Sequence, residues 1–145
     1  MSKPDDARVA GRLSVAYMMA IASETLRRFP VDLLDLLLIF TIANFNLMAQ
    51  TRDSPAADRL SDPEPERNGV SRNAVSRAVN VPLETVRRRI AGLIEKKVLV
   101  ERPDGIVFAP DNPIGLGNNT ELSDLNLHLL RQLFRGLKAC GIDLD

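Results

Sequence analysis

The sequence predicts a mainly α-helical protein with one small β-hairpin, and three observations support that expectation. Long apolar patterns at helical spacing run through three segments, 9–28, 31–49 and 121–139. Two shorter helical patterns, about 71–79 and 82–97, follow each other with almost no chain between them. A turn sequence, Pro103-Asp104-Gly105, then separates two short apolar strands. Helices of this kind with a hairpin attached predict a small α-rich domain.

The 145 residues fit one domain, or a compact module with dimerisation arms. Residues 51–67 contain three prolines and only Leu60 as a large apolar residue, which is typical of a flexible loop or linker. We therefore expect four parts: N-terminal helices at 1–50 that supply dimerisation and the first helix of a central module, the linker at 51–67, the central module at 68–110, and a connector with a C-terminal helix at 111–145.

The second predicted helix, 31–49, is apolar on nearly every side. Pro30 ends the helix before it, and Asp32 and Asp35 favour its first turn, where carboxylates meet the positive end of the helix dipole. A helix that is apolar all round has to be covered all round. One short chain offers little cover, so the pattern predicts a homodimer. Its uncharged run is short for a membrane span of ~20 residues, so we expect no membrane insertion.

The predicted C-terminal helix, 121–139, carries a leucine stripe, and Thr120 is its expected cap. Such a stripe either covers the helix's own domain or forms a dimer arm, and the sequence leaves both alternatives open. Cys140 and His128 are the only cysteine and histidine, which excludes an intrachain disulfide and makes a zinc site improbable. No nucleophile, base and orienting group can be assembled, so we expect neither an enzyme nor a cofactor, and a cytoplasmic location.

Charge is segregated although the whole chain is neutral. Residues 67–102 hold nine Lys or Arg against three Glu, and the excess of acidic residues lies elsewhere. A basic block of this kind is an electrostatic footprint for phosphate. Two short helices, a tight turn at Asn80-Val81 and a hairpin following in that order describe a winged helix-turn-helix, with a recognition helix at about 82–97 and a wing at 98–109.

On a helical wheel, Val86 and Ile90 fall on the core side of the recognition helix. Arginine, threonine and glutamate on the other side are residue types that read guanine, the thymine methyl group and cytosine. Gly92 in mid-helix costs about 1 kcal/mol relative to Ala, and a close approach to another backbone would explain it. The predicted DNA-binding residues are Arg72, Asn73, Glu84, Thr85, Arg87, Arg88, Arg89 and Arg102.

The stretch SRNAVSRAVNVPLETVRRRIAGLIEKKVLVERPDGIVF resembles the DNA-binding module of bacterial winged-helix transcriptional regulators of the MarR-like and IclR-like kind. The phrase ETVRRRIAGLIEKKVLVE carries most of that resemblance. It implies that Thr85, Arg87 and Arg88 contact DNA from the recognition helix and that Arg102 contacts it from the wing. The large effector domain of IclR-like proteins is missing after the module, so no ligand-sensing role carries over.

The leading hypothesis is a homodimeric bacterial regulator that binds double-stranded DNA at a pseudo-palindrome. The alternative is a winged helix used as a protein-interaction or assembly module, because a fold does not dictate a function. The arginine run is then a solvated helix face, and Arg72 and Asn73 are turn residues rather than a phosphate site. A small apolar effector between dimer helices is conceivable, but no polar anchor indicates one.

Overall fold

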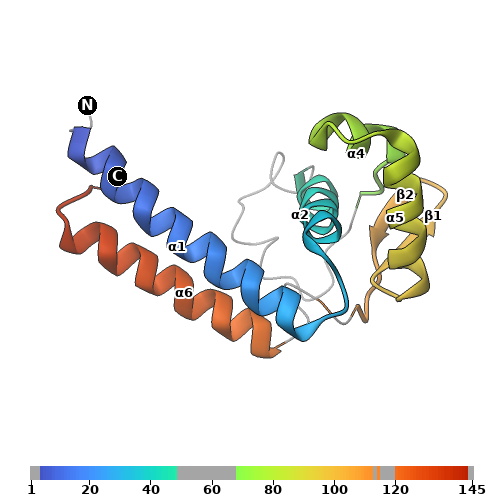
Figure 1. Cartoon of the computed structure of the whole chain (residues 1–145). Coiled ribbons are helices and arrows are strands. Elements are labelled where there is room, and N and C mark those ends of the chain that lie inside the picture. Colours follow the sequence, from blue (N-terminus) through green and yellow to red (C-terminus); the bar gives the residue numbers. More distant parts are fainter. Residues whose placement is uncertain (1–3, 49–67, 113, 115–119, 144–145) are drawn as a thin grey trace. The chain divides into compact units, whose positions relative to one another are not determined.

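The computed structural model describes residues 4–48, 68–112, 114 and 120–143 (Figure 1). Helices make up 71% of these residues and one two-stranded antiparallel hairpin accompanies them, so the expected fold class of mainly α with a small hairpin is confirmed. The chain divides into two compact units, the first Met1–Pro30 with Ile114–Asp145 and the second Val31–Pro113. The predicted linker at 51–67 lies outside the described residues.

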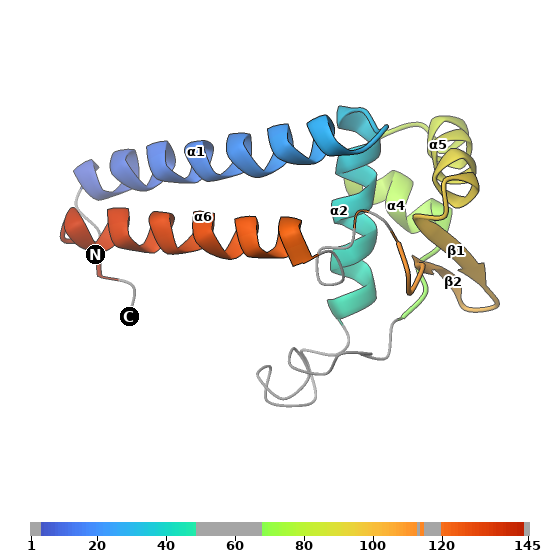
Figure 2. The same cartoon turned by 90° about the horizontal axis from the view of Figure 1, so that it is seen from below.

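The first unit is a helical hairpin of α1 (Pro4–Arg28) and α6 (Thr120–Ala139), which run antiparallel side by side (Figure 2). Ile21 and Leu122 are buried between them. Gly136 allows the close approach, since a Cβ there would lie 3.0 Å from a methyl carbon of Leu13. The leucine stripe of α6 therefore packs on α1 of the same chain, as the alternative of an intrachain cover predicts. This contact does not exclude that α6 also serves as a dimer arm.

Polar groups fix the register of this hairpin. The Tyr17 hydroxyl donates a hydrogen bond to Asn126 Oδ1, and Arg28 pairs with Glu121 at 3.0 Å. α1 begins five residues before the expected start at Val9. Proline in a first turn followed by Asp5 and Asp6 is a favourable helix start, and this signal extends the helix to Pro4.

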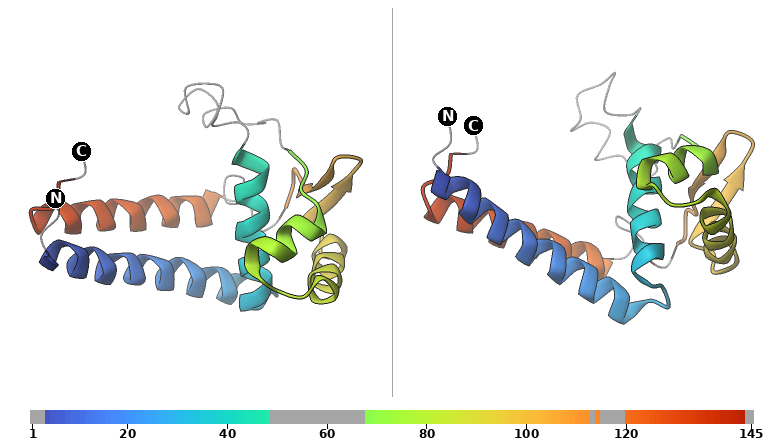
Figure 3. Two further views of the ribbon diagram at one scale, coloured as in Figure 1. Left: turned by 90° about the horizontal axis from the view of Figure 1, so that it is seen from above. Right: turned by 45° about the horizontal axis from the view of Figure 1, so that its top comes forward.

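The second unit is built around α2 (Leu33–Met48), which packs against α4 (Arg72–Val79), α5 (Leu83–Glu95) and β2 (Gly105–Phe108). Both views of Figure 3 show these elements gathered in one cluster. Four apolar side chains of α2 are almost fully buried within the chain: Leu36, Leu38, Ile39 and Ile42. The inference that α2 needs a second subunit to cover it is therefore wrong for most of its surface, because its own module covers it.

α2 begins with a reciprocal cap formed by Asp32 and Asp35, the two carboxylates that were predicted for its first turn. Asp32 Oδ1 accepts a hydrogen bond from the Asp35 N–H at 2.9 Å, and Asp35 Oδ2 accepts one from the Asp32 N–H at 3.3 Å. This is a capping box with aspartate in both positions. No single helix among the described residues is long and apolar enough to cross a membrane, although α1 and α2 taken as a broken pair pass on length and composition alone.

The hairpin consists of β1 (Leu99–Arg102) and β2, paired antiparallel with Leu99 opposite Phe108. Val70 extends the pairing on the other edge of β2, exchanging two hydrogen bonds with Ile106 at 3.0 and 2.8 Å. The chains come so close here that a Cβ on Gly69 would lie 2.6 Å from the backbone of Asp104. The sequence prediction missed this third strand segment, which is too short to show an alternating pattern.

Asn46 of α2 joins the helix to the hairpin from a position that is only 1% exposed. Its Nδ2 donates to the carbonyls of Asn68 and Ile106 at 2.6 and 3.1 Å, and its Oδ1 accepts from the Phe108 N–H at 3.1 Å. The amide side chain thereby occupies the edge of β2 beyond Val70. A buried asparagine with both its N–H groups and its oxygen hydrogen-bonded fixes one arrangement of helix and hairpin.

Candidate nucleic-acid interface

α4 begins at a serine cap, as the sequence predicts. The Ser71 hydroxyl accepts a hydrogen bond from the Ala74 N–H at 3.1 Å, and Ser71 itself is extended. A side-chain acceptor at this position satisfies one of the N–H groups that a first helical turn leaves open. Asn73 is exposed in this first turn. The start of α4 therefore presents a polar end to solvent.

A three-residue turn at 80–82 joins α4 to α5. Asn80 takes the left-handed conformation (φ 55°, ψ 45°), which asparagine tolerates better than most residues. Ser76 ties the turn to α4: its hydroxyl donates to the Val81 carbonyl at 2.6 Å and its own carbonyl accepts from the Val81 N–H at 3.2 Å. The angle between the two helices is thus held by backbone geometry and two hydrogen bonds.

α5 has one buried and one exposed side. Val86 and Ile90 have no exposed surface in the core, while Glu84, Arg87 and Arg88 are exposed. The predicted division of this helix into a core face and a solvent face is confirmed. Pro82 is the cap residue and not the first helical residue, so α5 begins one position later than expected.

Two features of α5 differ from expectation. Gly92 has no atom within 4 Å of the place where a Cβ would lie, so the suggested close backbone approach is wrong. The helix also ends at Glu95, because Lys97 adopts a left-handed φ of 63° and the Val98 N–H closes the last turn on the Leu93 carbonyl at 3.0 Å. Glycine usually occupies this place, so the sequence carried no stop signal.

The three consecutive arginines of α5 divide into two kinds. Arg87 pairs with Glu84 at 3.2 Å on the surface, with side chains 56% and 85% exposed. Arg88 is exposed, and no ion pair to it occurs within the described part of the chain. Arg89 points to α2, where it pairs with Asp32 and, at 3.4 Å, with Asp35. Arg89 was predicted to contact DNA, and the structure instead ties it to the cap of α2.

The pairing of Arg89 is visible in the electrostatics of the cap. The Asp35 N–H and then the Arg89 guanidinium hold the pKa of Asp32 below its ordinary value, and the hydrogen bond to Asp32 raises the pKa of Arg89. Asp32 and Arg89 are separated by 57 residues. No local sequence pattern signals such a contact, although the Asp-x-x-Asp spacing does signal the cap.

Arg72 is likewise engaged within the module. Its two terminal nitrogens donate to the two carboxylate oxygens of Glu101 at 2.8 and 3.1 Å, which is the bidentate geometry of a strong ion pair. This pair joins the first residue of α4 to β1, lowers the pKa of Glu101 and raises that of Arg72. Arg72 therefore holds helix and hairpin together at the place where the sequence predicted a phosphate contact.

The tip of the hairpin carries a second bidentate pair. Arg102 Nε and Nη2 donate to the two oxygens of Asp104 at 3.0 and 2.9 Å, and Asp104 also accepts the Gly69 N–H at 3.0 Å. Arg102 first and the Gly69 N–H second lower the pKa of Asp104. Both groups are about half exposed, so Arg102 keeps access to solvent.

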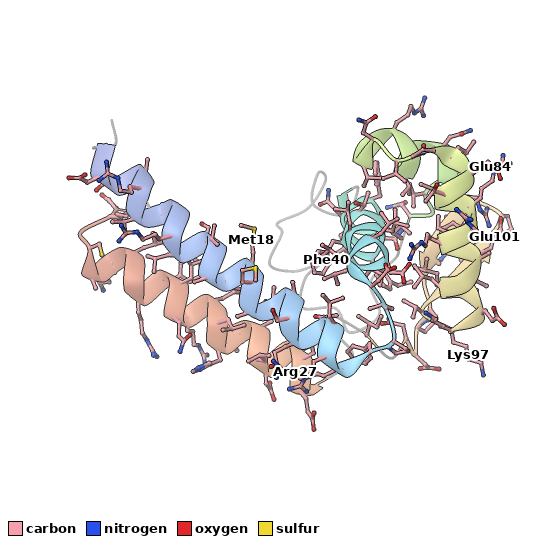
Figure 4. The ribbon with its side chains drawn as sticks, in the orientation of Figure 1. Met18, Arg27, Phe40, Glu84, Lys97 and Glu101 are labelled. Carbon is pink, nitrogen blue, oxygen red and sulfur yellow. The ribbon has the colours of Figure 1, made fainter. Side chains whose placement is uncertain are left out.

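The predicted site residues thus fall into two sets. Glu84, Arg87 and Arg88 lie together on the exposed face of α5, beside half-buried Thr85, with Asn73 at the start of α4. Three arginines, at 72, 89 and 102, pair with acidic residues of the same unit. The prediction omitted three exposed cations among the described residues of this unit, Arg77 on α4 and Lys96 and Lys97 after α5. Figure 4 shows Glu84 and Lys97 at opposite ends of α5.

The described residues hold no group of three or more His, Cys, Asp or Glu that is able to bind a metal ion. Comparison of the chain with protein-family models, curated proteins and solved structures found no match. The interpretation of the site therefore depends on its own residues and geometry.

Proposed function

We propose that the Val31–Pro113 unit is a winged helix-turn-helix that binds double-stranded DNA, with α5 as its recognition helix and the β1–β2 hairpin as its wing. The exposed face of α5 carries this proposal. It presents Glu84, Arg87 and Arg88 to solvent, while the opposite side of the same helix is fully buried. A rigid helix with such side chains has the dimensions and the chemistry for the major groove.

Each exposed residue has a role that its chemistry favours. Arg88 is the strongest candidate for a bidentate contact to guanine, because its guanidinium forms no ion pair with the residues that the structure describes. Arg87 first has to leave Glu84, but an exposed pair of this kind is worth only about 0–1 kcal/mol. Thr85 then meets a thymine methyl group, and Glu84 accepts from cytosine. Asn73 at the start of α4 contacts a phosphate.

The three paired arginines support this surface. Arg89 fixes α5 to the start of α2, Arg72 fixes α4 to β1, and the pairing of Arg102 with Asp104 shapes the wing tip. We retain Arg102 as a wing contact, since its side chain is 45% exposed. Positions 72 and 89 act by holding the recognition surface in place.

A sequence-specific DNA-binding module fits a bacterial transcriptional regulator that acts in the cytoplasm, where the chromosome is. The test is selection of bound duplexes from a random pool with the purified full chain, followed by titration of the enriched sequence. Affinity should fall steeply with salt, because each phosphate contact releases counterions. Failure to enrich any sequence, with no retention on DNA at moderate salt, would contradict DNA binding and favour a protein-interaction module.

The residue assignment has a matched test. Replacing Arg87 and Arg88 together by Ala should weaken binding to the selected sequence by at least about tenfold and relax its sequence preference. The control replaces Arg131 and Arg135 of α6 by Ala, which removes the same charge from exposed positions outside the module, and both variants are compared at a concentration where sedimentation gives them the mass of the unaltered protein. Equal losses in both variants would show a general effect of charge and overturn the assignment to α5.

A further inference from the structure

The hairpin of α1 and α6 leaves large apolar side chains in water. Val15 and Met18 on α1 are each 54% exposed, and Leu127 and Phe134 on α6 are 45% and 51% exposed. These residues belong to two series with the spacing i, i+4, i+7, i+11, which we call the outer seams: Gly11, Val15, Met18 and Ala22 on α1, and Ser123, Leu127, Leu130 and Phe134 on α6. This is the seam spacing of packed helices.

Both outer seams lie on the same side of the hairpin. At about 100° per residue, each outer seam is rotated by about 100° from the side that packs on the other helix, in the same rotational sense. Because α1 and α6 run in opposite directions, equal rotations bring the two seams to one common face. Figure 4 shows Met18 on the side of α1 that points away from α6.

We propose that this face docks on the same face of a second copy of the chain, forming a four-helix bundle. Each of the two helices has an apolar side that packs on the other helix and, in addition, its outer seam. Two apolar seams are what a helix of a four-helix bundle needs, whereas a two-helix hairpin buries only one of them. A face that packs on itself around a two-fold axis is also the commonest interface of homo-oligomers. The homodimer is thus carried by α1 and α6, and not by α2.

Charge favours one orientation of the two copies. The end of the hairpin that contains the start of α1 and the end of α6 has an excess of cations, because Arg8, Arg12, Arg131, Arg135 and Lys138 outnumber Asp5, Asp6 and Asp143. The other end contains Glu24, Glu121 and Asp124 together with Arg27 and Arg28, which pair with Glu24 and Glu121, so Asp124 is the acidic residue there without such a pair among the described residues. A two-fold axis along the helices lays the cationic ends on each other. An axis across the helices lays each cationic end on the acidic end of the partner, with each α6 antiparallel to its own copy.

In that orientation, Asp124 of one copy lies opposite Lys138 of the other. The two residues are 14 positions apart on one edge of the α6 outer seam, and the antiparallel crossing point falls between them. The α1 helices then cross near Val15 and Met18. At 1.5 Å per residue, the two Arg28 residues that precede the DNA-binding units lie roughly 35 Å apart.

The distance between the two Arg28 residues matters for DNA binding, and this step rests on the proposed function. Half-sites one turn apart on DNA are separated by about 34 Å, so the dimer places the entry points of its two modules at a suitable distance for a palindrome. The dimer itself does not depend on DNA binding. A dimer that fails to bind DNA would overturn the proposed function and leave the dimer inference intact. A single chain that binds DNA would overturn the dimer inference and leave the proposed function intact.

The test is the mass of the full chain in solution without DNA, by light scattering or sedimentation. We expect twice the chain mass of 16.0 kDa. Met18→Glu with Phe134→Glu should give a single-chain mass at the same concentration with helicity retained, because both side chains are exposed within one chain. The control, Ala16→Glu with Gln132→Glu, adds the same charge at exposed positions off the outer seams and should remain dimeric.

The orientation is tested by exchanging charges. Asp124→Lys or Lys138→Glu alone should weaken dimerisation by about tenfold, and the two together should restore it. A single-chain mass for the unaltered protein at tens of micromolar would overturn the dimer. The face with the outer seams would then be covered by something other than a second copy. A dimer that survives Met18→Glu with Phe134→Glu would overturn the surface, and additive losses in the charge exchange would overturn the antiparallel orientation.

Discussion

Replacement of Asn46 by Ala should separate α2 from the edge of the hairpin. Asn46 makes three side-chain hydrogen bonds, at 2.6, 3.1 and 3.1 Å, from an almost fully buried position. A buried hydrogen bond contributes about 0.5–1.5 kcal/mol, and the Phe108 N–H would lose its acceptor. Alanine recovers roughly 0.5 kcal/mol through better helix propensity. The net loss of stability in this unit should be about 2–3 kcal/mol.

Amide hydrogen exchange measures this loss within the unit concerned. The N–H groups of Val70 and Ile106 bond each other's carbonyls across the edge that Asn46 closes, so their protection reports its opening. A loss of 2–3 kcal/mol corresponds to protection lowered by roughly 30- to 150-fold. Asn44→Ala is the control, since Asn44 is exposed two residues earlier in the same helix. Protection within about threefold of the unaltered protein would refute the role of Asn46.

Three further predictions concern the same unit. Gly92→Ala should raise its stability by about 1 kcal/mol, because the added methyl group meets open space, and a lower urea midpoint would contradict this. Arg89→Met should weaken binding to the selected DNA without changing which bases are preferred, as duplex selection with the variant would show. The lowered pKa values of Asp32, Glu101 and Asp104 stabilise the fold above the ordinary carboxylate pKa of about 4, so this stability should disappear as pH falls through the lowered values. Urea midpoints that rise from pH 5 to pH 3 would disprove that assignment.

Local sequence signals predicted the elements of this fold well. Helical periodicity located all five described helices, and Ser71, Asn80 and Pro82 marked the cap and turn between α4 and α5. The hairpin followed from Pro103-Asp104-Gly105. Each of these signals acts over a few residues through capping, periodicity or turn chemistry. The end of α5 was misplaced by two residues because Lys97 adopts a conformation that its residue type disfavours.

Contacts between distant segments were beyond these signals. The pairing of Val70 with β2, the bonds of Asn46 to the hairpin and the pairing of Arg89 with Asp32 each join segments that lie far apart in the chain. A helical wheel places Arg89 on the flank of α5 but does not show what lies beside that flank. The solvent face was therefore predicted correctly, while the ion pairs that engage Arg72, Arg89 and Arg102 were not predicted.

The ion pairs change what the basic block of the sequence means. Counted along the chain, it is a uniform excess of cations, but Arg72, Arg89 and Arg102 are bound to acidic residues that the fold brings to them. Those three charges are largely neutralised locally and act as connections between α2, α4, α5 and the hairpin. Arg77, Arg88 and Lys97 have no such pairs within the described residues, so their fields extend into solvent. We therefore assign the proposed DNA contacts and the stability of the fold to different arginines. A substitution at Arg88 should change what the surface binds while leaving the fold intact, and a substitution at Arg72 should loosen the fold first and weaken binding only as a consequence.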